Sequence, residues 1–175
     1  YRHLYDEKNY FIAKIPFSEL AHNQIAKEVA KFIKNNYITR KKCLCIDLDN
    51  TLWGGVLGED GVSGVKFGSN TYEGECFKNF SNYLKDISKK GVILAINSKN
   101  NIKDVREMFE KHPEMSLSLN DFSCIKINWK PKNDNLKEIS KELNIGLDSI
   151  VFLDDSAYER ENMKNFIPSV NILDF

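Results

Sequence analysis

Short apolar runs alternate along this chain with segments whose apolar residues recur at helical spacing. The strand-length runs lie at 42–48, 92–96 and 149–153, with a weaker run at 124–127 and a short segment at 170–173. Apolar runs of this kind are typical of parallel strands that are buried on both faces. The helical segments lie at about 18–35, 71–90, 102–109, 136–143 and 157–165. Strands that alternate with helices require crossover connections, so the sequence predicts an α/β fold, doubly wound around a central parallel sheet.

The composition restricts the class of protein. A chain of 175 residues is about the size of one domain. Its 25 Lys and Arg balance its 25 Asp and Glu, so a basic surface for nucleic acid or for a membrane is not expected. No apolar stretch reaches the roughly 18 residues that a membrane helix needs, and no signal peptide is recognisable. The four cysteines form no CxxC pair, which favours a reduced, cytoplasmic protein.

The chain divides into a lead-in over 1–40 and a main domain over 41–175. The lead-in contains the helix at 18–35, whose apolar face we expect to pack on the main domain. Residues 53–64 are rich in glycine and lack helical periodicity, so this stretch is predicted to form turns and a small hairpin. Because the chain begins at Tyr1 and not at a methionine, we expect flanking domains of a longer protein.

Aspartates follow two of the predicted strands. Asp47 and Asp49 end the first run, and a spacing of two at a strand end points both carboxylates to one side. Asp154 and Asp155 follow the strand at 149–153. The first pair alone could be solvated, but carboxylates from two strands that meet at one sheet edge repel each other unless a cation binds. Oxygen ligands of this kind suit Mg²⁺, so all four aspartates are candidate magnesium ligands.

The motif Asp-x-Asp-x-Thr at 47–51 resembles the haloacid dehalogenase (HAD) superfamily of phosphohydrolases and phosphotransferases. The resemblance implies a three-layer α/β/α Rossmann-like fold with Mg²⁺ as cofactor. It also implies phosphoryl transfer through an aspartyl-phosphate, with Asp47 as the nucleophile. Asp49 would protonate the leaving group and then activate water. Asp155 matches the position in direct contact with the metal.

Further motifs of the superfamily follow in order, and the resemblance assigns substrate binding to Thr51, Ser98, Asn100 and Lys132. Ser98 matches the residue that binds the transferring phosphoryl group, although Ser98 or Asn100 could instead cap the next helix. A lysine should neutralise the phosphoryl oxygens. Lys130 has the Lys-Pro form common in the superfamily, whereas Lys132 stands at the predicted helix start. We favour Lys132.

The segments between these motifs are too short for a large cap domain. About twenty residues separate the first motif from the next helix, and about thirty separate the serine motif from the lysine. The site is therefore expected to be open, with a minimal cap formed by the flap at 53–64. Trp53 and Trp129 could line its mouth or pack in the core. Glu159 could bind a metal-bound water, orient the lysine or be solvated.

A narrower resemblance covers nearly the whole chain. The segments 47–61, 98–100, 128–129 and 143–155, together with the lead-in segment 13–18, are similar to the FkbH-like branch of the superfamily, subfamily IIIC, whose members are capless. The best understood type dephosphorylates 1,3-bisphosphoglycerate and loads the glyceryl group onto an acyl carrier protein. The resemblance therefore names an acyl carrier protein as an alternative partner.

One position departs from the loading type. Those transferases carry a cysteine between the two motif aspartates, whereas this chain has Leu48. Cys45 lies inside the apolar run, where a thiol is more often a small core residue than a nucleophile. The sequence therefore favours a Mg²⁺-dependent phosphatase or phosphotransferase that acts on a small phosphorylated metabolite. The alternatives are a glyceryl transferase and a non-catalytic interaction module.

Overall fold

The computed structural model describes residues 4–37 and 40–173, which form two compact units, Tyr1–Arg40 and Lys41–Phe175. The first unit contains α1 (Glu7–Ala13) and α2 (Glu19–Tyr37). The prediction that this lead-in packs on the main domain stays a prediction. Within the described ranges, every helix is too short or too polar to cross a membrane.

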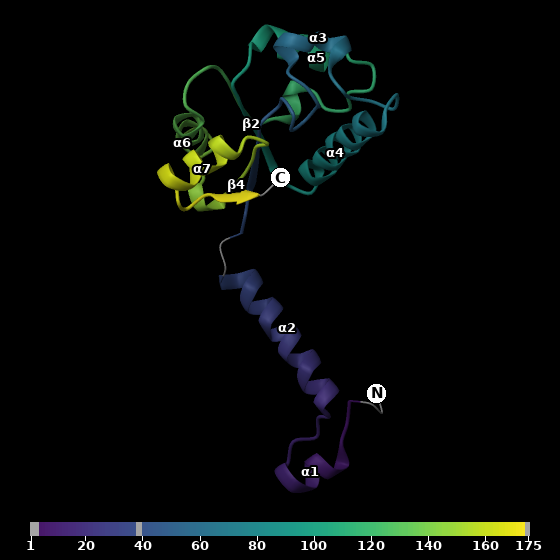
Figure 1. Ribbon diagram of the computed structural model, residues 1–175. Helices are drawn as coiled ribbons and strands as arrows, with labels where there is room; N and C mark the ends of the chain where they lie inside the picture. Colours follow the sequence, from purple (N-terminus) through teal and green to yellow (C-terminus); the bar gives the residue numbers. More distant parts are fainter. Residues whose placement is uncertain (1–3, 38–39, 174–175) are drawn as a thin grey trace. The chain divides into compact units, whose positions relative to one another are not determined.

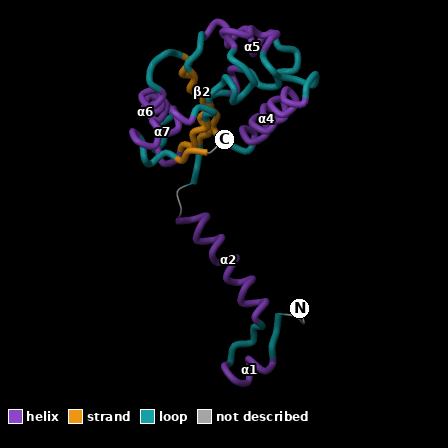
Figure 2. Tube along the Cα trace, in the orientation of Figure 1, coloured by secondary structure: helices purple, strands orange, loops and turns teal. Residues whose placement is uncertain are grey.

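The second unit is built on a parallel sheet with the strand order β3-β2-β1-β4-β5 (Figures 1 and 2). Its strands are β1 (Cys43–Ile46), β2 (Ile93–Ser98), β3 (Cys124–Ile127), β4 (Ile150–Leu153) and β5 (Asn171–Leu173). All four neighbouring pairs are parallel. The doubly wound α/β fold predicted from the alternation of strands and helices is confirmed.

Helices cover both faces of this sheet (Figure 1). The helices of this unit are α3 (Leu57–Gly64), α4 (Tyr72–Lys89), α5 (Ile102–Lys111), α6 (Lys132–Glu142) and α7 (Ala157–Phe166), with short 3₁₀ turns η1 (Leu119–Asp121) and η2 (Leu147–Ser149). Helices α4 and α5 pack on one face, while α6 and α7 pack on the other. The result is the three-layer α/β/α arrangement.

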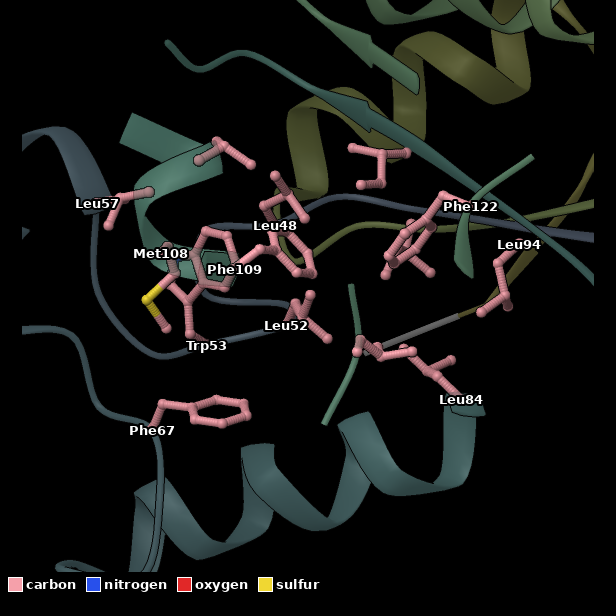
Figure 3. Packing of buried hydrophobic residues seen from close by; sticks show 14 of the residues in the cluster. Leu48, Leu52, Trp53, Leu57, Phe67, Leu84, Leu94, Met108, Phe109 and Phe122 are labelled. Atoms are coloured by element: carbon pink, nitrogen blue, oxygen red, sulfur yellow. The ribbon is translucent and has the colours of Figure 1, made fainter. Parts of the chain in front are cut away.

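Strand β1 shows how the sequence builds two cores. Successive side chains of a strand point to opposite faces. Leu44 and Ile46 therefore face α4 and α5, and Cys43 and Cys45 face α6 and α7. Figure 3 shows the first core continuing beyond the strand, where Leu48, Leu52 and Trp53 pack with residues of α4 and α5. Both faces of β1 are buried, which explains its uninterrupted apolar sequence.

The strand order fixes where a ligand can bind. From β1 the chain moves outward through β2 to β3, then returns to the other side of β1 to form β4 and β5. The crossovers thus reverse direction between β1 and β4, which opens a crevice beyond the carboxyl ends of these two strands. The amide of Asp47 donates a hydrogen bond to the carbonyl of Leu153 at 3.0 Å, so the two strand ends are joined at this crevice.

The glycine-rich flap differs from its prediction. An antiparallel bridge between Gly54 and Lys66 closes it as a hairpin would, but the segment between them contains helix α3. A kink at Gly61, with φ 65°, divides this helix. A residue that precedes the flap stabilises the first turn of α3, because the amide of Leu57 donates a hydrogen bond to Asp49 Oδ1 at 3.1 Å. A short kinked helix stabilised by a distant carboxylate leaves no periodic signal in the sequence.

Candidate active site

Three carboxylates gather at the crevice between β1 and β4. Asp47 follows β1, and Asp154 and Asp155 follow β4. One carboxylate oxygen from each residue lies within 4.8 Å of the other two. Asp47 and Asp154 are buried, and Asp155 is partly exposed. Burial, followed by the charge of Asp47, raises the pKa of Asp155, and burial raises the pKa of Asp154 to about 6.

Lys132, the first residue of α6, supplies the cation of this cluster. Its ammonium lies 2.6 Å from Asp154 Oδ2 and 3.0 Å from Asp47 Oδ1, and the residue is only 4% exposed. Burial acts to lower the pKa of Lys132, but the charges of Asp47 and Asp154 outweigh it and raise the pKa, so the ammonium stays protonated. Lys130 is exposed and pairs with Glu138 at 3.3 Å. Of the two candidate lysines, the structure brings Lys132 to the aspartates.

A network of buried amides fixes the start of α6, and the sequence analysis missed it. Asn97 Nδ2 donates to the Lys132 carbonyl at 2.8 Å. Asn135 Nδ2 donates in turn to Asn97 Oδ1 and to Asn128 Oδ1, each at 3.1 Å. Asn97 and Asn135 are fully buried. The available signal was a polar residue directly after the apolar run at 92–96, since a buried amide needs partners.

Asp49 lies apart from the three-carboxylate group. Its Oδ1 accepts hydrogen bonds from Trp53 Nε1 at 2.9 Å and from the Leu57 amide at 3.1 Å, and its Oδ2 accepts one from Asn100 Nδ2 at 2.9 Å. Burial raises the pKa of Asp49, and Asp47 adds to the shift, while these hydrogen bonds act against it. The structure thus brings the carboxylates of Asp47, Asp154 and Asp155 together as a group that could hold a metal ion, and the expected metal contact of Asp49 stays a prediction.

Trp53 does not line the mouth of the site. Its side chain is fully buried, and its ring packs edge-on against Phe109 with centroids 6.0 Å apart. The indole nitrogen donates a hydrogen bond to Asp49, so Trp53 connects the hydrophobic core with the candidate active site. Trp129 is exposed. The sequence neighbours of a tryptophan do not show whether its side chain lies in the core or at the surface, which is why both alternatives were left open for Trp53 and Trp129.

The loop that carries Asp154 and Asp155 is held by its neighbours. Thr51 Oγ1 accepts a hydrogen bond from the Asp155 amide at 3.2 Å, and the Ser156 amide donates to Asp154 Oδ1 at 2.9 Å. Arg160 Nη1 donates to the carbonyls of both aspartates, at 2.8 and 2.7 Å. Thr51 is fully buried. Its hydroxyl therefore helps to order this loop, and the substrate contact expected of Thr51 stays a prediction.

The remaining predicted residues flank the cluster. Ser98 ends β2 and is buried. Asn100 Oδ1 accepts from the Asn101 amide at 2.9 Å while its Nδ2 donates to Asp49, so this side chain positions Asp49 and keeps one donor and one acceptor for the substrate contact expected of it. Glu159 pairs with Lys99 at 2.6 Å and so has a partner other than Lys132.

The chemistry of the cluster fits a divalent cation. Three carboxylates and one ammonium leave two negative charges uncompensated in a largely buried site. Asp47 Oδ1 is buried and has no hydrogen-bond donor of standard geometry among the described residues, while the Lys132 ammonium lies 3.0 Å away. A buried oxygen without a hydrogen bond is costly unless another ligand meets it. Carboxylate oxygens at this spacing suit Mg²⁺.

Comparisons with known proteins agree with this geometry. The N-terminal part of the protein BF1531 from Bacteroides fragilis, which contains a phosphatase domain and is complexed with Mg, is 37% identical to this chain, with a TM-score of 0.80. The match covers 99% of this chain and 46% of that chain, so this chain spans less than half the length of that relative. No match was found among curated proteins.

A more distant structure shares the fold. The HAD-family enzyme bt-2542 from Bacteroides thetaiotaomicron, in complex with magnesium and inorganic phosphate, is 14% identical, with a TM-score of 0.51 and coverage of 75% of this chain and 92% of that chain. The chain thus shares its fold with a HAD-family enzyme, as expected from the first motif, and its acidic cluster could hold a metal ion. A family model matches residues 42–171, and the chain belongs to the NLI interacting factor-like phosphatase family.

Proposed function

We propose that this protein is a Mg²⁺-dependent phosphohydrolase that acts on a small phosphorylated metabolite through an aspartyl-phosphate on Asp47. The observation that carries the proposal is Asp47 Oδ1, a buried carboxylate oxygen that accepts no hydrogen bond from the described residues and lies 3.0 Å from the Lys132 ammonium. Such an oxygen keeps its lone pairs for an electrophile, and the ammonium stands where phosphoryl oxygens need positive charge.

In the first half-reaction, an Asp47 oxygen forms a bond to phosphorus while the bond from phosphorus to the leaving-group oxygen breaks. The leaving oxygen takes a proton from Asp49. Burial raises the pKa of Asp49, which makes the protonated form accessible. Oδ1 already accepts two hydrogen bonds and Oδ2 only one, so Oδ2 keeps a lone pair that can carry this proton.

In the second half-reaction, the deprotonated Asp49 takes a proton from water as the water oxygen forms a bond to phosphorus. The bond between Asp47 and phosphorus breaks, which releases inorganic phosphate and restores both aspartates. Lys132 and the Ser98 hydroxyl stabilise the phosphoryl oxygens in both steps. Asp47, Asp154 and Asp155 would hold Mg²⁺, which when bound reduces the repulsion between Asp47 and an anionic phosphate.

The residues around these groups position them. Thr51 and Arg160 hold the loop of Asp154 and Asp155, and Asn100 holds Asp49. These contacts support a site preformed for in-line attack. The reactive groups of Asp47, Asp49 and Lys132 each have a partner that holds them, which favours an enzyme over a non-catalytic interaction module.

Glyceryl transfer to an acyl carrier protein is the function of the FkbH-like type, and the thiol chemistry it uses finds no support here. Cys45 is fully buried, and burial raises its pKa well above the usual range, so the thiolate nucleophile is suppressed. Leu48 occupies the position between the two motif aspartates and is also fully buried. The FkbH-like assignment remains an interpretation of the motifs.

Phosphate release tests the proposal. We would assay sugar phosphates, phosphoglycerates and an aryl phosphate in Mg²⁺ and in EDTA, with wild type, Asp47→Asn and the matched control Asp86→Asn, whose side chain is exposed on α4. We expect release that requires Mg²⁺, is lost in Asp47→Asn and is kept in the control. Mass spectrometry of the quenched enzyme should find one added phosphoryl group on Asp47. Release that persists in Asp47→Asn would refute the proposed nucleophile.

A further inference from the structure

An ion pair that the proposed mechanism does not use joins the loop after β2 to helix α7. The Lys99 ammonium lies 2.6 Å from Glu159 Oε1. Lys99 directly follows β2, and Glu159 lies in the first turn of α7, which follows β4. Because β2 and β4 lie on opposite sides of β1, the pair connects the two sides of the crevice in which Asp47 lies.

This ion pair is partly withdrawn from solvent. The Glu159 side chain is 11% exposed and the Lys99 side chain 36%. An exposed ion pair is weak because water screens it, whereas a buried carboxylate needs a partner for its charge. Lys99 is the one cation that pairs with Glu159 among the residues that the structure describes. Removing the Lys99 ammonium would leave a largely buried carboxylate without compensation, so the pair holds both side chains in place.

The Glu159 end of the pair is fixed to the loop that carries the proposed metal ligands. The Glu159 amide donates to Ser156 Oγ at 3.4 Å, a contact that caps α7. Arg160 Nη1 donates to the carbonyls of Asp154 and Asp155, at 2.8 and 2.7 Å. The residues on both sides of Glu159 thus tie the first turn of α7 to this loop. Glu159 is therefore a firm anchor for a side chain that reaches across the crevice.

Ser98, whose hydroxyl we propose to bind the phosphoryl oxygens, borders the Lys99 end of the pair. Ser98 is 1% exposed, and its hydroxyl forms no hydrogen bond with any described residue. The position of that hydroxyl therefore depends on the backbone. The Asn128 amide donates to the Ser98 carbonyl at 3.1 Å, which holds the end of β2. Beyond this point, the side chains of Lys99 and Asn100 anchor the loop, on α7 and on Asp49 respectively.

We infer that the ion pair of Lys99 with Glu159 is a positioning pair, which holds the Ser98 hydroxyl at a fixed place relative to the loop after β4. A hydroxyl that stabilises a transition state acts only where the charge develops, and a misplacement of about 1 Å can cost about 100-fold in rate. The inference rests on the proposed function and adds two residues that act through Ser98 without touching the substrate. It gives Glu159 a role other than binding a metal-bound water or orienting Lys132.

Phosphate release from the best substrate among the sugar phosphates, phosphoglycerates and aryl phosphate, measured in saturating Mg²⁺, tests the inference. Lys99→Met removes the ammonium, and Glu159→Gln removes the carboxylate charge at nearly the same size. Lys99→Met is also made in a Ser98→Ala background, where no hydroxyl is left to position. Lys78→Met is the matched control, because Lys78 forms a partly buried ion pair with Glu114 at 2.7 Å that links α4 to the segment after α5. Urea unfolding verifies that each variant is folded.

We expect Lys99→Met and Glu159→Gln each to lower kcat about tenfold while KM changes less than about threefold, because a positioning role acts on the transition state. In the Ser98→Ala background, Lys99→Met should lower kcat no further. Lys78→Met should keep the wild-type kcat. An unchanged kcat in folded Lys99→Met, a change confined to KM, or an equal loss in the Ser98→Ala background would overturn the inference. Absence of Asp47-dependent release from the wild type would instead refute the proposed function.

Discussion

Replacing Lys132 with methionine tests the charge balance of the site most directly. The ammonium of Lys132 is the cation that contacts both Asp47 Oδ1 at 3.0 Å and Asp154 Oδ2 at 2.6 Å. Methionine has a similar length and suits an apolar environment. In Lys132→Met, two buried carboxylates lose their compensating charge while the packing volume stays nearly the same.

The expected loss of stability is large in the absence of metal. Removing one partner of a buried ion pair costs about 3–5 kcal/mol, because the other charge stays buried without compensation. Protonation of the carboxylates limits this cost at low pH, since burial already raises the pKa of Asp154 to about 6. The full effect is therefore expected at pH 8. Added Mg²⁺ binds the folded state and compensates the same carboxylates, so the loss should be smaller when it is present.

Urea unfolding at pH 8, in EDTA and in Mg²⁺, measures both effects. Lys130→Met is the matched control, because Lys130 is exposed and its pair with Glu138, at 3.3 Å, is a surface contact. Its loss should stay within about 0.5 kcal/mol in either buffer. A loss below about 1 kcal/mol for Lys132→Met in EDTA, or equal losses for the two variants, would refute the proposed charge balance.

Three further predictions follow from single contacts. Trp53→Phe keeps a buried ring but removes the 2.9 Å hydrogen bond to Asp49, so we expect unfolding free energy to fall by about 1–3 kcal/mol and kcat to fall about tenfold, as measured by urea unfolding and phosphate release. The hydrogen bond from Lys78 is the main reason that the pKa of Glu114 lies at about 2, below its usual 4.5. Stability from this carboxylate is present above pH 4.5 and is lost as the pH falls toward 2, so wild type should lose more stability over that range than Glu114→Gln; equal losses would contradict the assignment. Gly74→Ala brings a Cβ to 2.8 Å from a backbone carbonyl and should destabilise the protein by about 1–3 kcal/mol despite the better helix propensity of alanine, whereas an unchanged unfolding midpoint would show that α4 can shift.

The central strands β1, β2 and β4 could be predicted because their two buried faces leave an apolar signal, but their ends could not. The prediction for the second strand stops at 96, whereas β2 continues to Ser98. Asn97 and Ser98 still pair with Lys126 and Ile127 of β3. Backbone pairing does not require apolar side chains, so a strand that enters a polar site continues after its sequence signal has ended.

The residues of the candidate site that the strand topology brings together could be predicted. The hydrogen-bond partners of their side chains were harder to predict. Asp47, Asp154 and Asp155 follow neighbouring parallel strands, and the rule that strand ends meet at one edge is enough to group them. Asp49 was grouped with them by the period of two, but β1 ends at Ile46 and that period does not extend into the loop. Its donors, among them Trp53, come from the flap and from the loop after β2, which no local pattern indicates.

The direction of the side chains after β1 explains why the residue between the two aspartates matters. Asp47 faces the carboxylate cluster, Asp49 accepts hydrogen bonds from the flap, and Leu48 between them is fully buried among apolar side chains of the α4 and α5 core (Figure 3). A thiol on this backbone at position 48 would enter the same apolar surroundings. Burial raises thiol pKa values, as it does at Cys45, and so suppresses the thiolate that acyl transfer needs. With Leu48 held in the core, Asp47 remains the nucleophile that we propose for a phosphorylated substrate.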